Sequence, residues 1–201
     1  MPMLTATRVS MALLLAAFAA AHADPETYTV DPHHTFPVFE VSHYGYSMQR
    51  GRFNSVSGSI VLDRQAGRGS IDIAIDAASL DMGLADWDEK LRSEDFFDVV
   101  RYPRILFKAD KLKFDGERLL GADGTLTLRG VSKPVAVTVN NFHCGKSRFT
   151  GNSMCGADAS AQLKRSDFGM NKLLPGVGDD IRISIAIEGS VGTVPGQASG
   201  Q

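Results

Sequence analysis

The sequence predicts an all-β protein, built either as a sandwich or as a closed antiparallel barrel. Three observations predict it: apolar and polar residues alternate along many segments, glycine-rich turns separate these segments, and a single segment has helical spacing. Short connections favour antiparallel neighbours. Because each strand would carry one apolar face, the sheet must pack on a second sheet or close on itself.

Alternation with a period of two is clearest near the C-terminus, where Ile181, Ile183, Ile185 and Ile187 are separated by polar or small residues. Similar patterns predict about eight strands and a ninth at the end of the chain. Their expected ranges are 26–31, 36–44, 50–63, 69–77, 104–115, 117–129, 133–144, 155–166 and 180–190. A phase shift near Asp110 predicts a β-bulge.

One segment has helical rather than strand spacing. Leu80, Leu84, Trp87 and Leu91 form an apolar stripe at helical intervals. We therefore expect one or two short helices over about 83–98, linking two strands. Their apolar face must cover a barrel mouth or pack on a sheet.

Residues 1–23 are predicted to be a cleaved secretory signal peptide. They combine Arg8, an apolar run from Val9 to Ala21, and small residues before Asp24. At helical rise that run spans only about 20 Å, which is short for a membrane anchor. The expected product is a soluble exported protein, periplasmic in a host with two membranes, with one domain over 24–191 and a flexible tail over 192–201.

Composition and charge narrow the function classes. The chain has 201 residues, of which 43% are hydrophobic and 22% charged, which argues against a disordered protein. A net charge of −2 argues against a nucleic-acid partner.

Cys144 and Cys155 are the two cysteines of the chain. Export favours a disulfide between them, because oxidising compartments preserve such bonds. Reactive thiols and a metal site are the alternatives, but a redox pair is usually spaced C-x-x-C and a zinc site needs more ligands.

Catalytic motifs are not found in the sequence. It contains no G-x-S-x-G, no phosphate-binding loop, no dinucleotide-binding glycine pattern and no H-E-x-x-H. His33 and His34 are adjacent and would point to opposite faces of a strand. We therefore predict no catalytic residue, no metal site and no cofactor.

Five ordered fragments resemble the YceI-like family of exported polyisoprenoid-binding proteins, and the resemblance covers roughly residues 27–190. The fragments are Asp31-Pro32-His33-His34-Thr35 with Phe39 to Gly45; Gly51-Arg52-Phe53 with Gly58; Leu91 to Asp98 with Tyr102-Pro103 and Phe107; Gly124 to Val135; and Asp167-Phe168-Gly169. Trp87 and Lys90 stand where the family often has an arginine and a histidine.

The resemblance implies a lipocalin-like closed antiparallel β-barrel, with one or two short helices capping an elongated apolar pocket. It also implies a long-chain isoprenoid, quinone-type or fatty ligand and no catalysis. Candidate wall residues are Phe39, Val41, Phe53, Leu84, Trp87, Leu91, Phe96, Phe97, Phe107, Phe168 and Met170. Candidate polar contacts are His43, Tyr46 and Arg92, although Arg92 could instead pair with Asp88.

Three functions are considered for such a fold. The expected function is that of a lipid carrier whose partner is an amphiphilic ligand. The protein is expected to be a monomer or a homodimer and to have no transmembrane segment after cleavage of the signal peptide. An alternative is a non-catalytic stress-response or structural interaction protein with a filled barrel. An isoprenoid-processing enzyme is the third, and it lacks a recognisable catalytic constellation.

Overall fold

The computed structural model describes residues 24–192. The predicted signal peptide and residues 193–201 of the predicted tail lie outside the described residues. The strands are β1 (Glu26–Val30), β2 (Phe36–His43), β3 (Ser47–Phe53), β4 (Val56–Asp63), β5 (Arg68–Asp76), β6 (Leu80–Asp81), β7 (Arg104–Asp115), β8 (Arg118–Leu128), β9 (Val131–Lys146), β10 (Ser153–Lys164) and β11 (Val177–Ser190). The helices are η1 (Ala77–Ser79), α1 (Ala85–Arg92) and η2 (Arg165–Phe168).

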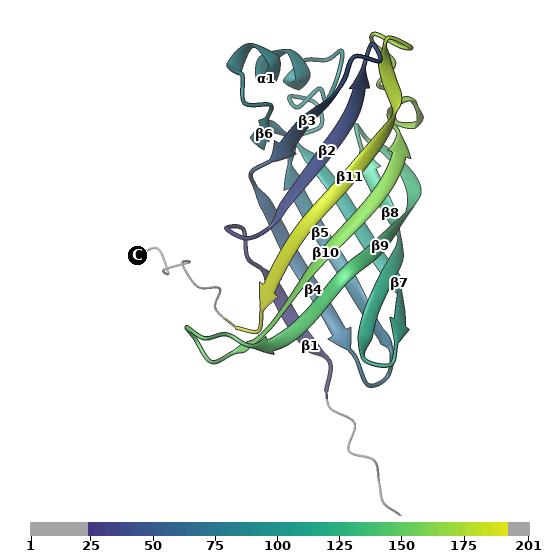
Figure 1. Ribbon diagram of the computed structural model, residues 1–201. Helices are drawn as coiled ribbons and strands as arrows, with labels where there is room; N and C mark the ends of the chain where they lie inside the picture. Colours follow the sequence, from purple (N-terminus) through teal and green to yellow (C-terminus); the bar gives the residue numbers. More distant parts are fainter. Residues whose placement is uncertain (1–23, 193–201) are drawn as a thin grey trace, which may run out of the picture.

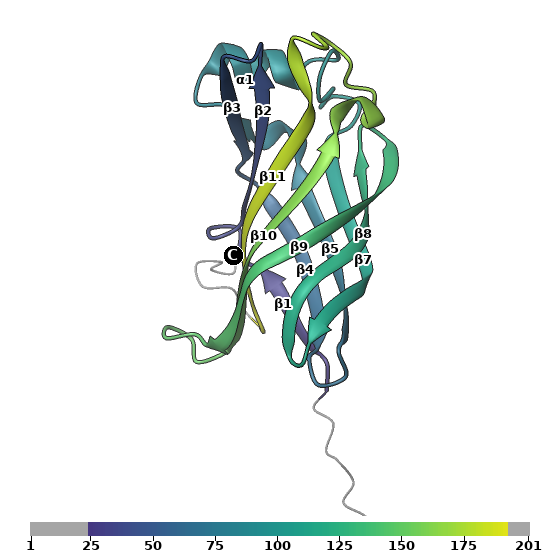
Figure 2. The same cartoon turned by 45° about the vertical axis from the view of Figure 1, so that its right-hand side comes forward.

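The strands form a closed antiparallel barrel, which decides between the two predicted architectures. The order around the barrel is β1-β4-β5-β7-β8-β9-β10-β11, and pairing of β1 with β11 closes the ring. Figures 1 and 2 show long, tilted strands that surround one axis. Closure removes the exposed edges that a flat sheet would leave.

β11 is shared between two partners along its length. Its C-terminal residues Gly189 and Ser190 pair with β1, whereas Ile181 to Ala186 pair with β2. β2 then pairs with β3, and β3 with the short β6. The barrel wall is therefore extended at one end by β2, β3 and β6, next to α1 (Figure 1).

Two sequence predictions need correction. The single strand expected over 50–63 is two strands, β3 and β4, with different partners. In one continuous strand, residues three positions apart would point to opposite faces. Phe53 and Val56 are both buried, so the alternation breaks between them. The strand expected over 155–166 ends at Lys164, since the next residues form η2.

Other predictions are confirmed. The pairing of β7 with β8 shifts between Ala109 and Lys111, which is the bulge expected near Asp110. The helical segment forms one helix, α1, which is shorter than the predicted range: Leu80 of the expected stripe lies in β6, Leu84 precedes the helix, and the chain turns after Arg92. Among residues 24–192, no helix is both long and apolar enough to cross a membrane.

Candidate functional site

The interior of the barrel holds an apolar cavity of about 390 Å³. On β11, Ile181, Ile183, Ile185 and Ile187 all line this cavity. These inward side chains are only half-buried, while Arg182 on the outer face is exposed. A filled core would bury them completely, so their residual exposure shows that the barrel is hollow.

The cavity runs along most of the barrel. Val177 and Gly189, near opposite ends of β11, both line it. The chain between them covers about 40 Å along the strand. With the strand tilt usual in barrels, that corresponds to about 30 Å along the axis. The shape is long and narrow, as an extended hydrocarbon chain would require.

Phenylalanines from several strands meet in the half of the cavity near α1. Phe39, Phe53 and Phe97 have ring centroids 5.4 to 6.1 Å apart. Phe39 pairs across the strands with Gly51, where an added Cβ would collide with the Phe39 ring. Gly124 leaves the same kind of space for Phe107. The glycines therefore allow large rings to lie flat against the wall and leave the centre open.

The cavity opens at the end of the barrel that carries α1, which we call the open end. Trp87, Lys90 and Leu173 line the cavity and are exposed, and they come from α1 and from the loop before β11. Tyr44 and Tyr46 in the β2–β3 turn are exposed beside them. The opening is thus surrounded by aromatic and aliphatic side chains.

Polar side chains reach the cavity at this open end. His43 follows Phe39 and Val41 on the inward face of β2, and its ring lies 4.9 Å from that of Tyr44 and 6.2 Å from that of Trp87. Gln49 and Lys90 also line the cavity. These groups offer hydrogen-bond donors and acceptors where a ligand would emerge into water.

Arg165 is a buried cation at the open end. Its guanidinium donates to the carbonyls of Gly178 at 2.8 Å, Met170 at 2.7 Å and Val177 at 2.9 Å. Burial lowers the pKa of Arg165, and the nearby Asp179 opposes that shift. The side chain holds the loop before β11 in place and contributes positive charge to the cavity wall.

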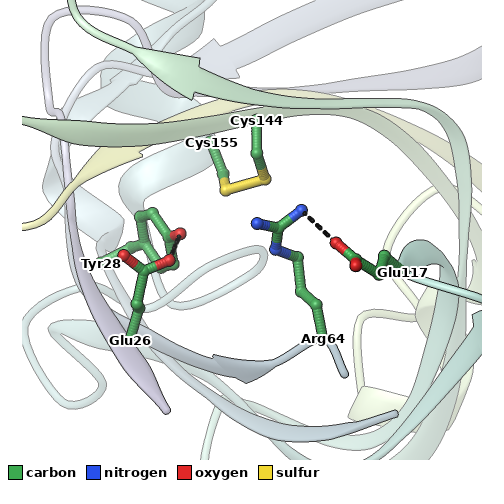
Figure 3. Close-up of a disulfide and its surroundings, with 6 residues drawn as sticks. All are labelled: Glu26, Tyr28, Arg64, Glu117, Cys144 and Cys155. Carbon is green, nitrogen blue, oxygen red and sulfur yellow. Dashed lines mark hydrogen bonds and ion pairs between the residues drawn. A yellow bond between two sulfur atoms is a disulfide. The ribbon is translucent and has the colours of Figure 1, made fainter. Parts of the chain in front are cut away.

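The opposite end, which we call the closed end, carries a disulfide and two polar pairs (Figure 3). Cys144 on β9 and Cys155 on β10 are cross-strand partners and form the predicted disulfide. Arg64 points towards the disulfide and lies 3.2 Å from Glu117. On the other side of this end, Tyr28 packs with Leu62 and Cys155 in a buried cluster.

A short hydrogen bond also belongs to the closed end. The Tyr28 hydroxyl donates to Glu26 Oε2 at 2.5 Å. This bond lowers the pKa of Glu26, although burial acts in the opposite direction. Burial, reinforced by the neighbouring carboxylate, raises the pKa of Tyr28.

The structure brings most of the predicted site residues to the cavity. The predicted residues that line it are Phe39, Val41, His43, Phe53, Trp87, Leu91, Phe96, Phe97, Phe107 and Met170. They come from β2, β3, α1, the turn after α1, β7 and the turn after η2.

The other predicted site residues lie elsewhere. Tyr46 is 90% exposed at the tip of a turn, and Leu84 is 56% exposed just before α1. Phe168 is 1% exposed within the packed core around η2. The Arg92 guanidinium donates a hydrogen bond to the backbone carbonyl of Leu80. It also lies 3.9 Å from Asp88 Oδ2, which fits its alternative role as an ion-pair partner.

Sequence reasoning missed several polar residues of the lining, among them Gln49, Lys90 and Arg165 at the open end and Thr35 and Glu188 farther along the barrel. A signal existed for Arg165, because Ala159, Ala161 and Leu163 precede it on the inward face at intervals of two. Gln49 and Lys90 carried no such signal, since their position depends on how β3 and α1 meet the barrel.

Comparison with known proteins agrees with this architecture. A UPF0312 protein of Pseudomonas paraeruginosa is 33% identical over 192 residues, covering 93% of this chain and 98% of the relative. The solved structure of Burkholderia cenocepacia BcnA superposes with a TM-score of 0.66 at 23% identity, covering 79% of this chain and 98% of that one. A polyisoprenoid binding domain from Saccharophagus degradans gives a TM-score of 0.60 at 18% identity, covering 82% and 98%.

These two structural likenesses show the fold. The family model described as the YceI-like domain matches residues 28–189, which span the whole barrel from β1 to the last strand. The chain therefore belongs to the YceI-like family.

Proposed function

We propose that this protein binds one long-chain apolar amphiphile inside its barrel and acts as a carrier for it. The observation that carries the proposal is the apolar cavity of about 390 Å³, a volume within the usual range of roughly 300–1,000 Å³ for ligand sites. The ligand class is an isoprenoid, quinone-type or fatty chain. The polyisoprenoid binding domain of Saccharophagus degradans, which shares the fold, supports this class.

The energetics favour an apolar chain. Each methylene that leaves water contributes about 0.8 kcal/mol, so a long chain binds without any specific polar contact. An amphiphile also has a head group, and the open end is where His43, Gln49, Lys90 and Arg165 line the cavity. We therefore orient the ligand with its tail towards the disulfide and its head towards α1. Lys90 and Arg165 favour a head group that is anionic or rich in hydrogen-bond acceptors.

The proposed site of action is the periplasm, reached through a cleaved signal peptide. The N-terminal pattern of a basic residue, an apolar run and small residues supports it. The Cys144–Cys155 disulfide also supports it, because such bonds persist in oxidising compartments. No cofactor other than the bound lipid is proposed.

The first test is to purify the protein from the exported fraction and compare native with denaturing mass spectra. We expect an additional mass of a long-chain molecule that disappears on denaturation, and its extraction would identify the head group. After delipidation, a quinone or a polyprenyl phosphate should bind again. Trp87, the one tryptophan of the chain, lies at the open end and reports binding by its fluorescence.

A matched pair of variants tests the location of the site. Ala157 lines the cavity from β10 and is half-buried, so Ala157→Phe should occupy space without displacing a packed neighbour. Excluding about three methylenes would weaken binding roughly fiftyfold. The neighbouring Asp158 is exposed on the outer face, so Asp158→Phe should leave the affinity unchanged.

Two results would reject the proposal. Equal affinity of wild type and Ala157→Phe would mean that the ligand lies outside the barrel. Failure of both ligand classes to rebind, with no lipid in the exported protein, would instead favour an interaction protein whose cavity stays empty.

A further inference from the structure

A histidine and two carboxylates come together in the barrel wall, where the β1–β2 connection meets β11. Asp31 and His34 belong to the connection between β1 and β2, and Glu188 lies near the end of β11. Their ligand-type atoms, one imidazole nitrogen and two carboxylate oxygens, all lie within 4.8 Å of one another. Ligand atoms about 2.1 Å from a tetrahedral ion lie about 3.4 Å from one another, so coordination requires side-chain rotations that draw these atoms closer together.

The group occupies a defined position in the fold, at the point along β11 where its pairing partner changes from β2 to β1. The Asp31 amide donates to the Glu188 carbonyl at 2.9 Å, and the Glu188 amide donates to Thr35 Oγ1 at 3.2 Å. These bonds fix the backbone under all three side chains. The arrangement is therefore built by strand pairing and does not depend on a loose surface loop.

Charge also favours a cation here. Asp31 is 2% exposed, a degree of burial that a carboxylate tolerates only with strong partners. Its oxygens accept from the His33 amide at 2.9 Å and lie 2.8 Å from His34 Nδ1. Within residues 24–192, no lysine or arginine forms an ion pair with Asp31 or Glu188. Asp31 also lies 3.4 Å from His33 Nδ1, so its ionic partners are two exposed imidazoles, and a divalent ion would neutralise the two carboxylates.

We propose that Asp31, His34 and Glu188 bind a divalent first-row transition-metal ion, with Zn²⁺ as the probe. One imidazole and two carboxylates suit such an ion, and the 62% exposure of the His34 side chain leaves room for water ligands. A bound ion would replace the hydrogen bond between Asp31 and His34 and would fasten the β1–β2 connection to β11. It would thereby stabilise the closure of the barrel.

The test is calorimetric titration of untagged, metal-free full-length protein with ZnCl₂, followed by thermal unfolding with and without Zn²⁺. We expect one site and a higher Tm in the presence of Zn²⁺, because the ion binds the folded state. His34→Gln and Glu188→Gln should each weaken binding at least tenfold and abolish the rise in Tm. Both side chains are at least partly exposed, so the variants should fold, which circular dichroism would verify.

His33→Gln is the matched control, since it removes the adjacent histidine and keeps the three proposed ligands. It should bind Zn²⁺ with wild-type affinity and show the same rise in Tm. No Zn²⁺ binding by the wild type would overturn the proposal. So would equal losses in His33→Gln and His34→Gln, which would reveal an adventitious histidine pair, or unchanged binding in Glu188→Gln.

Discussion

The end of the barrel that carries α1 and the end that carries the disulfide belong to the same strands, but their cavity linings differ. At the open end, Trp87 and Leu173 line the cavity and remain 38% and 39% exposed. At the closed end, Leu62 and Cys155 line it and are buried. Strand pairing therefore makes the wall, while contacts between loops and strand ends decide where a ligand can pass.

The two ends also differ in how they are held. At the closed end, a disulfide joins the neighbouring strands β9 and β10, an ion pair joins the β4–β5 and β7–β8 turns, and a hydrogen bond links two residues of β1. The open end depends on Arg165, whose guanidinium binds three carbonyls in and around the loop before β11. The difference suits the proposed carrier function, because a ligand would enter where the contacts are non-covalent.

The largest effect is expected at the open end from Arg165→Met. Three carbonyls would lose a charged donor, which should lower the free energy of unfolding by about 4 kcal/mol. Urea unfolding measures it. Arg182→Met removes an exposed arginine of β11 and should change stability by less than about 0.5 kcal/mol. Similar effects of the two substitutions would mean that Arg165 does not hold the open end.

The closed end is tested by replacing both cysteines with serine. Loss of the Cys144–Cys155 bond should lower the free energy of unfolding by about 3 kcal/mol, again measured with urea. Ligand affinity should stay within threefold of wild type, because the opening lies at the other end. Wild type unfolded under reducing conditions should behave like the double variant. A tenfold loss of affinity would contradict a purely structural role for this end.

The smallest effect concerns the hydrogen bond between Tyr28 and Glu26. Tyr28→Phe should cost about 1 kcal/mol at pH 7. The bond lowers the pKa of Glu26, so its contribution is complete above the carboxyl's unfolded pKa and is lost as pH falls through the lower folded pKa. The difference between wild type and variant should therefore shrink from pH 5 to pH 3 in urea unfolding.

Tyr46→Phe is the control for that pH series, because Tyr46 is exposed at the open end. It should show no stability change that depends on pH over this range. A constant difference for Tyr28→Phe from pH 7 to pH 3 would assign the effect to packing of the ring and not to the Glu26 carboxylate.

Local patterns in the sequence predicted most of the strands that form the barrel wall. The isoleucines at 181, 183, 185 and 187 predicted the inward face of β11, and the phase shift near Asp110 predicted the bulge of β7. The resemblance to the YceI-like family added the hollow interior. The prediction of one continuous strand through Phe53 and Val56 was wrong, because this segment forms two strands with different partners. Alternation of apolar and polar residues does not record which neighbour a strand pairs with.

Candidate ligand contacts were predicted less well than strands. Aromatic character placed Phe39 and Trp87 correctly in the lining, but it also suggested Phe168, which the core around η2 buries completely. Tyr46 and Leu84 belong to the surroundings of the opening and not to the cavity wall. An apolar side chain packs equally well in a core or around a cavity, so residue type cannot separate the two.

The sequence by itself determined which faces of the strands are apolar, that a short helix interrupts them, and that two cysteines are available for a bond. These features depend on neighbours within a few residues, which local spacing records. Only the tertiary structure decided that β1 and β11 close the barrel, that its centre is open at the α1 end, and that Asp31, His34 and Glu188 meet on its wall. Those outcomes join residues far apart in the chain, and the pairing of strands determines them.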